Sequence, residues 1–273
     1  MLRFAANLTM LFTELPMLER FAAAAEAGFT GVEILFPYDI AARDLSRAAL
    51  AAGVEMVLMN TPPPNWAGGK RGFAAVPGLE ERFRHDFERA LRFAHVLRVR
   101  HIHIMAGEAQ GDEAQRVFLR NLQWAVRRAP HVSLTIEPIN QTDMPGYFLS
   151  DFDLAAQIIG QVGARNLGLQ FDAYHAQMIT GDVAGTWSRM ARLVRHIQIA
   201  GCPGRHEPGS GKIDGGQIDW PGFFAMVEQS GYDGWISAEY RPAGQTSAGL
   251  GWLHRARPPV QAPPGQGAAG GGG

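Results

Sequence analysis

The segment SLTIEPIN, residues 133–140, alternates polar and large apolar side chains and then ends in a carboxylate followed by a proline. Successive side chains of a β-strand point to opposite faces, so Leu134 and Ile136 share one face and Glu137 lies on the other. If the apolar face packs against helices, Glu137 points into the interior. Burying an unpaired carboxylate costs several kcal/mol, so we expect a compensating positive charge beside Glu137.

Three later segments repeat this alternation and also end in an oxygen-bearing side chain. They are LGLQFD (residues 167–172), HIQI (196–199) and WISAE (235–239). In each segment the large apolar residues occupy one face, which turns Asp172, Gln198 and Glu239 inward. Four successive strands are therefore expected to bring one oxygen ligand each to a single level of the interior.

Each of these four residues has an ordinary structural explanation when it is taken alone. A carboxylate at a strand end is often a helix N-cap or a salt-bridge partner at the rim, and a buried Gln198 is often a satisfied polar residue. Together, however, three acids on one interior ring repel one another unless a cation neutralises them. Because the oxygen set contains no Cys and no obligatory His, it favours Mg²⁺ or Mn²⁺ over Zn²⁺. The predicted metal ligands are Glu137, Asp172, Gln198 and Glu239.

Short apolar strands alternate with longer amphipathic segments along most of the chain. The expected strands are residues 3–8, 32–36, 54–59, 101–105, 132–137, 167–172, 195–200 and 234–239. The expected helices are residues 16–27, 43–52, 79–97, 113–128, 151–162, 182–193, 220–229 and 246–254. Ser150 and Asp151 form a helix start signal, and Gly28, Gly53 and Gly231 are stop signals. Eight strand–helix pairs in about 250 residues predict an α/β fold, a (β/α)8 TIM barrel. The competing fold is a doubly wound open sheet, and an interior ring of ligands favours the barrel.

The chain is expected to form one catalytic domain with a tail. No linker divides residues 1–254, whereas residues 255–273 are dominated by Pro, Gly and Ala and cannot bury a core. Two strand-to-helix connections, residues 60–78 and 201–219, are long. Loops of this length are usually functional, and both follow the carboxyl ends of strands, where barrel active sites are built.

Composition and charge exclude several classes of partner. The 273 residues are 46% hydrophobic and 19% charged and have a formal net charge of −1, which is typical of a soluble globular protein. A near-neutral chain gives no electrostatic reason to expect nucleic acid or a membrane surface. The single cysteine, Cys202, rules out an internal disulfide, and neither a signal peptide nor roughly 18 successive apolar residues can be recognised. We expect a cytoplasmic protein that binds a small molecule, and we leave a homo-oligomer open.

Eight segments together resemble the hydroxypyruvate isomerase family of xylose isomerase-like TIM barrels, which includes the closely similar 2-oxo-tetronate isomerases. They are MLRFAANLTMLFTELP (1–16), AGFTGVEILFPYD (27–39), KRGFAAVPG (70–78), LTIEPIN (134–140), QFDAYHAQ (170–177), HIQIA (196–200), HEPGSGKID (206–214) and WISAEYRP (235–242). The resemblance runs in order over residues 1–253 with few gaps, and the tail lies outside it. A single motif such as GVE is weak, whereas the whole series is highly specific.

The resemblance implies a metal-assisted isomerase acting on a small 2-oxo acid. It places the metal ligands on the four residues that strand parity selects, and it implies that Glu137 and Glu239 are the catalytic acid/base pair. The implied reaction interconverts hydroxypyruvate and tartronate semialdehyde through an enediolate, by removing a proton from one carbon and returning one to its neighbour. A 2-oxo-tetronate isomerase or a related sugar-acid epimerase would use the same site and stays open as an alternative.

An anionic substrate also needs a cation for its own carboxylate. The candidates are Lys70 and Arg71 in the first long loop, Arg205 and His206 in the second, and His175 just after Asp172. Arg71 is favoured because its fork of N–H groups matches a carboxylate bidentately, although a solvated loop charge is the ordinary alternative. His175 is expected to donate to a substrate oxygen, with a structural role as its alternative.

The remaining titratable residues have simpler explanations. His103 is expected to be a hydrogen-bonded barrel histidine, and Cys202 a free buried cysteine. Glu33 could either support a metal ligand or be an inward polar residue. Two other functional classes fit less well: a sugar-acid-binding protein has no need of two opposed acid/base groups, and a DNA-repair nuclease needs a basic groove and a His-rich zinc cluster.

Overall fold

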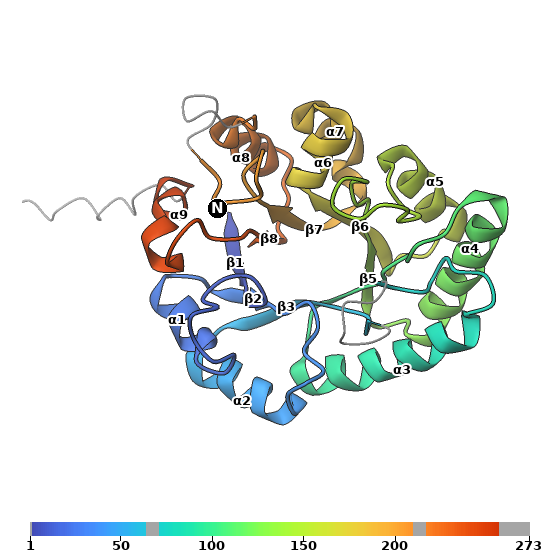
Figure 1. Ribbon diagram of the computed structural model, residues 1–273, viewed down its shortest axis with the longest axis horizontal. Coiled ribbons are helices and arrows are strands. Elements are labelled where there is room, and N and C mark those ends of the chain that lie inside the picture. Colours follow the sequence, from blue (N-terminus) through green and yellow to red (C-terminus); the bar gives the residue numbers. More distant parts are fainter. Residues whose placement is uncertain (1, 64–70, 210–216, 257–273) are drawn as a thin grey trace, which may run out of the picture.

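Eight parallel strands close into a barrel (Figure 1), which confirms the predicted (β/α)8 fold and makes the open-sheet alternative wrong. The structure, a computed structural model, describes residues 2–63, 71–209 and 217–256. The strands are β1 (Arg3–Asn7), β2 (Gly31–Glu33), β3 (Glu55–Asn60), β4 (His101–His103), β5 (Ser133–Ile136), β6 (Leu167–Asp172), β7 (Val194–Ile199) and β8 (Trp235–Ala238). Each strand pairs with the next one in the chain and β8 pairs with β1, so the sheet has no free edge.

The helices form a ring around the outside of the barrel (Figure 1). They are α1 (Arg20–Glu26), α2 (Ala42–Ala52), α3 (Glu80–Leu97), α4 (Gly111–Arg128), α5 (Phe152–Val162), α6 (Ala173–Thr180), α7 (Val183–Met190), α8 (Trp220–Gln229) and α9 (Gly251–Ala256). Two 3-10 helices, η1 (Ala191–Leu193) and η3 (Thr246–Gly249), complete the described elements. Within the part of the chain that the structure describes, no helix has both the length and the apolar character needed to cross a membrane.

The core between strands and helices fixes which side chains point into the barrel. The ring of Phe171 on β6 lies 5.4 Å from that of Trp187 on α7 and 6.0 Å from that of Phe223 on α8. Leu169 on β6 and Ile197 on β7 are fully buried in the same core. Because these odd-numbered residues face the helices, the even-numbered residues of β6 and β7 face the barrel interior, as strand parity predicts.

The strand register brings the predicted ligands to one end of the barrel. Asp172 lies beside Gln198, and Gln198 lies beside Ser237 of β8. Glu137 and Glu239 each follow the last residue of their strand directly. All four predicted ligands therefore lie at the carboxyl ends of adjacent strands.

The connection between β6 and β7 contains a helix that the sequence expectation lacks. Helix α6 starts directly after Asp172, whose side-chain oxygen accepts a hydrogen bond from the backbone N–H of Tyr174 at 2.8 Å. Its first four residues are all buried, so this short segment shows no amphipathic period that would have predicted a helix. The expected helix 182–193 is real but ends at Met190, before η1.

Both ends of the chain depart slightly from the expected boundaries. Helix α1 begins at Arg20 rather than at residue 16, because residues 16–19 form a turn in which Glu19 N–H donates to the carbonyl of Pro16 at 2.9 Å. The last helix, expected over residues 246–254, begins only at Gly251, after the 3-10 helix η3, and continues to Ala256. Most of the predicted tail (257–273) and parts of both long loops (64–70 and 210–216) lie outside the described residues.

A glycine brings the first long loop to the mouth of the barrel. Residues 72–75 run along the segment after β4, where Ala75 N–H donates to the carbonyl of Ala106 at 2.7 Å. Gly72 has φ +91°, and a Cβ there would lie 2.4 Å from the carbonyl oxygen of Met105. Only glycine tolerates this backbone and this close approach, and it holds the neighbouring Arg71 at the rim.

The N-terminus of α5 provides a test of the local sequence signals. The side chain of Asp151 accepts from the N–H of Leu154 at 2.7 Å, so Asp151→Ala should lower the free energy of unfolding by about 1 kcal/mol. Asp151→Asn keeps an accepting oxygen and should lose much less. Urea unfolding measures both, and equal losses for the two variants would show that the cap hydrogen bond is unimportant.

Candidate functional site

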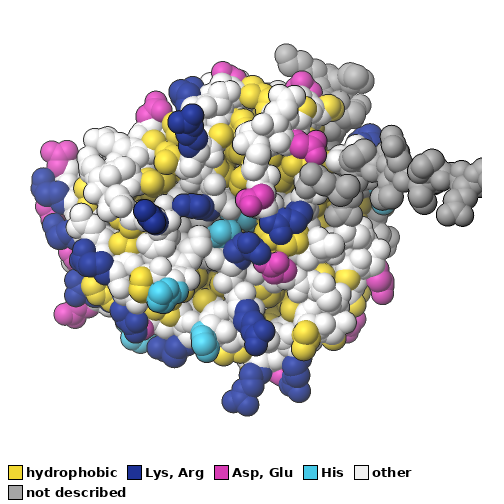
Figure 2. Space-filling view, turned by 180° about the vertical axis from the view of Figure 1, so that it is seen from behind, with side chains coloured by type: hydrophobic (Ala, Val, Ile, Leu, Met, Phe, Trp, Pro, Cys, Tyr) yellow, Lys and Arg dark blue, Asp and Glu magenta, His cyan; other side chains and the backbone are white. Residues whose placement is uncertain are grey.

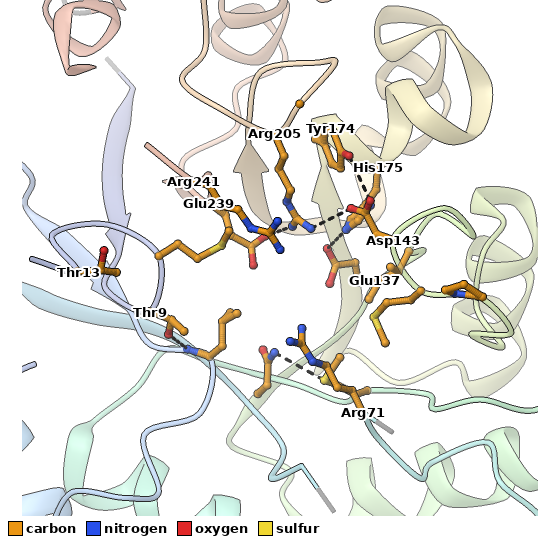
Figure 3. Close-up of a pocket in the computed structure, with 18 of the residues that line it drawn as sticks. Thr9, Thr13, Arg71, Glu137, Asp143, Tyr174, His175, Arg205, Glu239 and Arg241 are labelled. Atoms are coloured by element: carbon orange, nitrogen blue, oxygen red, sulfur yellow. Dashed lines mark hydrogen bonds and ion pairs between the residues drawn. The ribbon is translucent and has the colours of Figure 1, made fainter. Parts of the chain in front are cut away.

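A cavity of about 1140 Å³ opens at the carboxyl ends of the strands, and residues that follow all eight strands line it. Figure 3 shows Glu137 and Glu239 on either side of the Arg205 side chain, with Arg71 across the cavity from them and Arg241 beside Glu239. The cavity therefore combines acids at its base with guanidinium groups around them.

Two carboxylates, Glu137 and Glu239, line the cavity, and an oxygen of a third, Asp172, lies within 4.8 Å of one of Glu137. The exposed fractions of Glu137, Asp172 and Glu239 are only 5%, 1% and 6%. Burial raises the pKa of Glu137 well above its ordinary value, and repulsion from Glu239 and Asp172 raises it further. Burial likewise raises the pKa of Glu239 to about 8, although the adjacent guanidinium of Arg205 opposes the shift. The pKa of Asp172 is also raised, mainly by burial, against the same guanidinium.

Arg205 supplies positive charge to these acids. Its Nη2 lies 3.0 Å from Oε2 of Glu239 and 3.4 Å from Oδ2 of Asp172, and its Nη1 lies 3.2 Å from Oδ2 of Asp143. The guanidinium also lies over the ring of Tyr174, 5.0 Å from its centroid. The structure thus pairs this predicted substrate ligand with two of the predicted metal ligands.

The buried side-chain amide of Gln170 donates hydrogen bonds to two of the predicted metal ligands. Nε2 of Gln170 donates to Oε2 of Glu137 at 3.0 Å and to Oε1 of Gln198 at 2.7 Å, while Oε1 of Gln170 accepts from the hydroxyl of Thr135 at 3.2 Å. An amide nitrogen has two hydrogens, so Gln170 can serve both oxygens at once. Glu137 and Gln198 are consequently held close together.

Glu33 holds the other end of the Gln198 amide. Its Oε1 accepts from Nε2 of Gln198 at 2.8 Å and from Nδ2 of Asn7 at 2.8 Å, and its Oε2 accepts from Nε2 of His196 at 2.7 Å. Glu33 is fully buried. It is therefore an inward polar residue that also orients a predicted metal ligand, which resolves the two alternatives that the sequence leaves open.

His103 and Cys202 match their structural expectations. Nδ1 of His103 lies 3.2 Å from Oδ1 of Asn60 and 3.6 Å from Oε2 of Glu137. Burial lowers the pKa of His103 to about 3, so its ring is neutral. Cys202 is free and buried.

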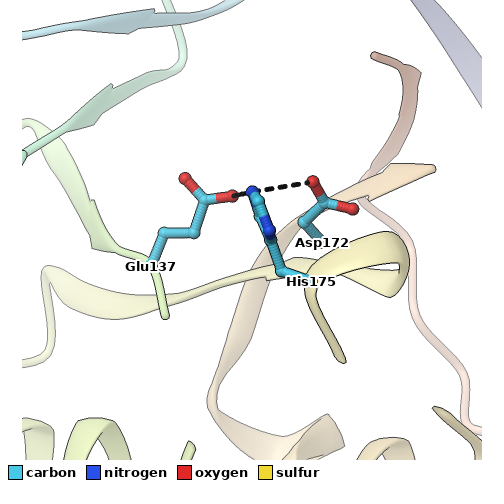
Figure 4. Close-up of side chains that lie close together, drawn as sticks. All are labelled: Glu137, Asp172 and His175. Carbon is cyan, nitrogen blue, oxygen red and sulfur yellow. Dashed lines mark ion pairs between the residues drawn. The ribbon is translucent and has the colours of Figure 1, made fainter. Parts of the chain in front are cut away.

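His175 lies in the first turn of α6 and faces the acids (Figure 4). Its Nε2 is 3.5 Å from Oδ2 of Asp172 and 4.0 Å from Oε1 of Glu137. Its Nδ1 contacts Asn140, at 2.7 Å from Nδ2 of that side chain. Burial lowers the pKa of His175 well below its ordinary value.

The acids and this histidine fit a metal ion. One ligand atom from each of Glu137, Asp172 and His175 lies within 4.8 Å of the other two. Oε1 of Glu137 is buried and has no hydrogen-bond partner among the described residues. A bound cation could coordinate this oxygen and so compensate for the missing hydrogen bond. These buried side chains can therefore hold a metal ion, with oxygen ligands that suit a hard cation.

Of the basic residues predicted to bind the substrate carboxylate, some line the cavity and others do not. Arg71 is exposed, lines the cavity and has no ion-pair partner within the described ranges. His206 does not line the cavity, and its Nδ1 donates to the backbone carbonyl of Arg241 at 2.8 Å. Its role as a substrate ligand stays a prediction, and Lys70 lies outside the described residues.

Arg241 is a candidate that the sequence analysis missed. Its side chain points into the cavity beside Glu239 (Figure 3), and no described carboxylate pairs with it. The motif AEYRP could have indicated this residue, because Arg241 lies two positions after Glu239, an acid predicted to point inward from the end of its strand. Asp143 and Tyr174 were also missed, since their contacts with Arg205 come from loop conformation.

Comparisons with known proteins agree with this architecture. A family model described as xylose isomerase-like TIM barrel matches residues 21–256. A 2-oxo-tetronate isomerase of Cupriavidus necator is 49% identical over 257 residues, which cover 92% of this chain and 97% of that protein. The hydroxypyruvate isomerase of Escherichia coli K12 is 39% identical, and the match covers 93% of this chain and 98% of that protein.

A crystal structure described as AP endonuclease, family 2, from Brucella melitensis is also similar. It has a TM-score of 0.89 at 41% identity, covering 94% of this chain and all of that one. Sequence and structure comparisons therefore both extend over nearly the whole chain.

The raised pKa of Glu239 predicts how stability depends on pH in protein freed of divalent ions. A carboxyl whose pKa is higher in the folded state binds protons more tightly there, so stability falls as pH rises. For Glu239 the loss spans the range from its ordinary value of 4.5 to about 8. Glu239→Gln should therefore lose less stability over this range than the wild type, as measured by urea unfolding in chelator. Parallel pH dependences for the two proteins would contradict the assignment.

Proposed function

Since the chain belongs to the xylose isomerase-like TIM barrel family, we propose that it is a metal-assisted aldose–ketose isomerase of short 2-oxo sugar acids. The observation that carries this proposal is the pair of buried carboxylates, Glu137 and Glu239, that face one cavity from β5 and β8. The similar proteins named as isomerases act as independent support.

The reaction moves a carbonyl group between two adjacent carbons of the acid. One carboxylate removes a proton from the carbon that carries the hydroxyl, which gives an enediolate, and a carboxyl group then returns a proton to the neighbouring carbon. The proton of the original hydroxyl passes to the former carbonyl oxygen, so the carbonyl and hydroxyl groups exchange places. Glu137 and Glu239 suit these roles because burial raises the pKa of Glu137 well above its ordinary value and that of Glu239 to about 8. A raised pKa makes a carboxylate a stronger base and allows its acid form to return the proton. Both side chains line the cavity, so both would be able to contact a small ligand bound there.

We propose Glu137, Asp172, Gln198 and Glu239 as the ligands of a divalent ion, Mg²⁺ or Mn²⁺. When bound, such an ion supplies Lewis acidity to the two adjacent substrate oxygens. Glu33 and Gln170 orient the amide of Gln198, and a neutral amide as fourth ligand avoids a further negative charge facing an anionic substrate. Carboxylate oxygens of Glu137 and Asp172 lie within 4.8 Å of each other, and Oε1 of Glu137 has no hydrogen-bond partner among the described residues, which supports a cation at this place. Glu239 is joined to these acids through Arg205.

The substrate carboxylate would bind to Arg71 or Arg241. Both guanidinium groups line the cavity without a carboxylate partner among residues 2–63, 71–209 and 217–256. Arg205 is less suited because it already pairs with three acids. We assign the carboxylate to Arg71, as the sequence predicts, and the far end of the substrate to Arg241.

Substrate length is the point on which the two isomerase activities differ. A cavity of about 1140 Å³ is large for hydroxypyruvate, since sites for whole drug-sized ligands are about 300–1,000 Å³. A relative named 2-oxo-tetronate isomerase is 49% identical to this chain, whereas a second protein of that name and the hydroxypyruvate isomerase are both 39% identical. Both observations favour a four-carbon 2-oxo acid, with hydroxypyruvate as the second substrate.

A DNA-directed activity has less support, although one similar structure is described as an AP endonuclease. On the face shown in Figure 2, Lys and Arg side chains are spread among acidic ones instead of forming one continuous groove. The formal net charge is −1, whereas binding to the phosphate backbone depends on clustered positive charge. Purified protein should leave abasic-site DNA uncut.

The acid/base assignment predicts a large loss of turnover in Glu239→Gln. The amide keeps the shape but cannot transfer the proton, so kcat should fall by roughly 10²–10⁴-fold while the thermal midpoint changes little. Chelator should also abolish wild-type activity, and Mg²⁺ or Mn²⁺ should restore it. Near-normal turnover of Glu239→Gln would remove this residue from the mechanism.

Two arginine variants test substrate binding and length together. Arg71→Ala should raise KM for both hydroxypyruvate and a 2-oxo-tetronate, because both carry the carboxylate. Arg241→Ala should raise KM mainly for the four-carbon acid, which reaches further across the cavity. The wild type should show the higher kcat/KM with the 2-oxo-tetronate, and a clear preference for hydroxypyruvate would overturn the assignment of substrate length.

A further inference from the structure

Nε2 of His175 could have either of two roles that exclude each other. This nitrogen lies among carboxylate oxygens that can hold a cation, so His175 could be a metal ligand through a bare nitrogen. It could instead carry a proton on Nε2 and donate it to an oxygen. A neutral imidazole has one N–H and one bare nitrogen, so the partner of Nδ1 decides between the two.

The partner of Nδ1 is Asn140, and the orientation of its amide is fixed independently of His175. Oδ1 of Asn140 accepts from the backbone N–H groups of Thr142 at 3.0 Å and Asp143 at 2.9 Å. Backbone N–H groups can only donate, so Oδ1 must face them and Nδ2 must face the other way. The amide cannot be turned over without placing hydrogens against hydrogens.

Two N–H donors of Asn140 therefore face Nδ1 of His175. Nδ2 is 2.7 Å away, and the backbone N is 3.4 Å away. Both Asn140 and His175 are almost fully buried, with exposed fractions of 2% each, so water does not substitute for these contacts. Nδ1 must be the acceptor, which leaves the ring proton on Nε2.

We propose that Asn140 is a positioning residue that keeps His175 in the Nε2–H form, so that His175 is a hydrogen-bond donor and not a metal ligand. The N–H points toward Oδ2 of Asp172 and Oε1 of Glu137, at 3.5 Å and 4.0 Å. These distances are longer than a good hydrogen bond, which leaves the donor free for a ligand oxygen. That this oxygen belongs to the substrate rests on the proposed function, whereas the position of the proton does not.

Burial supports a neutral ring, because it lowers the pKa of His175 well below the ordinary value. The buried contact with two donors also disfavours a second proton on Nδ1.

The experiment is nitrogen-detected NMR of protein labelled with ¹⁵N in its histidine rings, in the presence of chelator. The His175 signals are assigned by their loss in His175→Gln. In the wild type, Nε2 should be protonated and Nδ1 bare. In Asn140→Asp one carboxylate oxygen can still accept from Thr142 and Asp143, while the other faces Nδ1, so Nδ1 should gain a proton. A protonated Nδ1 in the wild type, or unchanged ring nitrogens in Asn140→Asp, would overturn the proposal.

Asn166→Asp is the matched control. Nδ2 of Asn166 donates to three backbone carbonyls, those of Val126, Ala129 and Val132, at 3.0–3.3 Å. Its loss should reduce stability without moving the proton of His175, because Asn166 does not contact that ring. A matching change of the ring nitrogens in this control would attribute the effect to general loosening and would sink the inference.

Electron spin-echo spectroscopy of bound Mn²⁺ gives a second readout. The wild type should show no directly coordinated histidine nitrogen, and a strong ¹⁵N coupling that disappears in His175→Gln would overturn the proposal. Failure to bind Mn²⁺ at all would count against the proposed function, while the NMR result would still decide the position of the proton.

Discussion

The site is organised by the electrostatic cost of placing three carboxylates on one buried ring. Glu137, Asp172 and Glu239 are almost fully buried; Glu239 and Asp172 raise the pKa of Glu137, and Asp172 raises that of Glu239. Hydrogen-bond donors around the acids stabilise their negative charge. They are the guanidinium of Arg205 after β7, the side-chain amide of Gln170 on β6 and the backbone N–H of Tyr174 at the start of α6. A divalent cation, as proposed above, would complete the same compensation.

Strand parity predicted which side chains of the site point inward from the barrel strands. The alternation of apolar residues in β5 to β8 gave the inward positions of Glu137, Asp172, Gln198 and Glu239, because side-chain direction in a strand depends only on the count of residues. The same alternation also turned Gln170 inward, but nothing in the sequence indicates that its amide joins two strands. That contact depends on the register between β5, β6 and β7.

The parts that escaped prediction lie on loops and short helices. Helix α6 is buried on several sides and has no amphipathic period. Arg241 and Asp143 depend on how the segments after β8 and β5 fold back over the barrel mouth, which local sequence does not determine. Asn140 is the clearest case: it lies three residues after Glu137, yet its role follows only from backbone N–H groups that fix its amide. The interior of the barrel thus supplies the charged centre, and the loops set the orientation and protonation of the groups around it.

The two hydrogens of the Gln170 amide have a consequence for how this enzyme class can diversify. Each hydrogen is committed to a different neighbour, Oε2 of Glu137 and Oε1 of Gln198. Replacing Gln198 by a side chain that offers no oxygen at that point would leave one buried hydrogen without an acceptor, which costs about 1–3 kcal/mol. A redesign that aims at a softer cation through a nitrogen ligand on β7 would therefore need to change Gln170 in the same step.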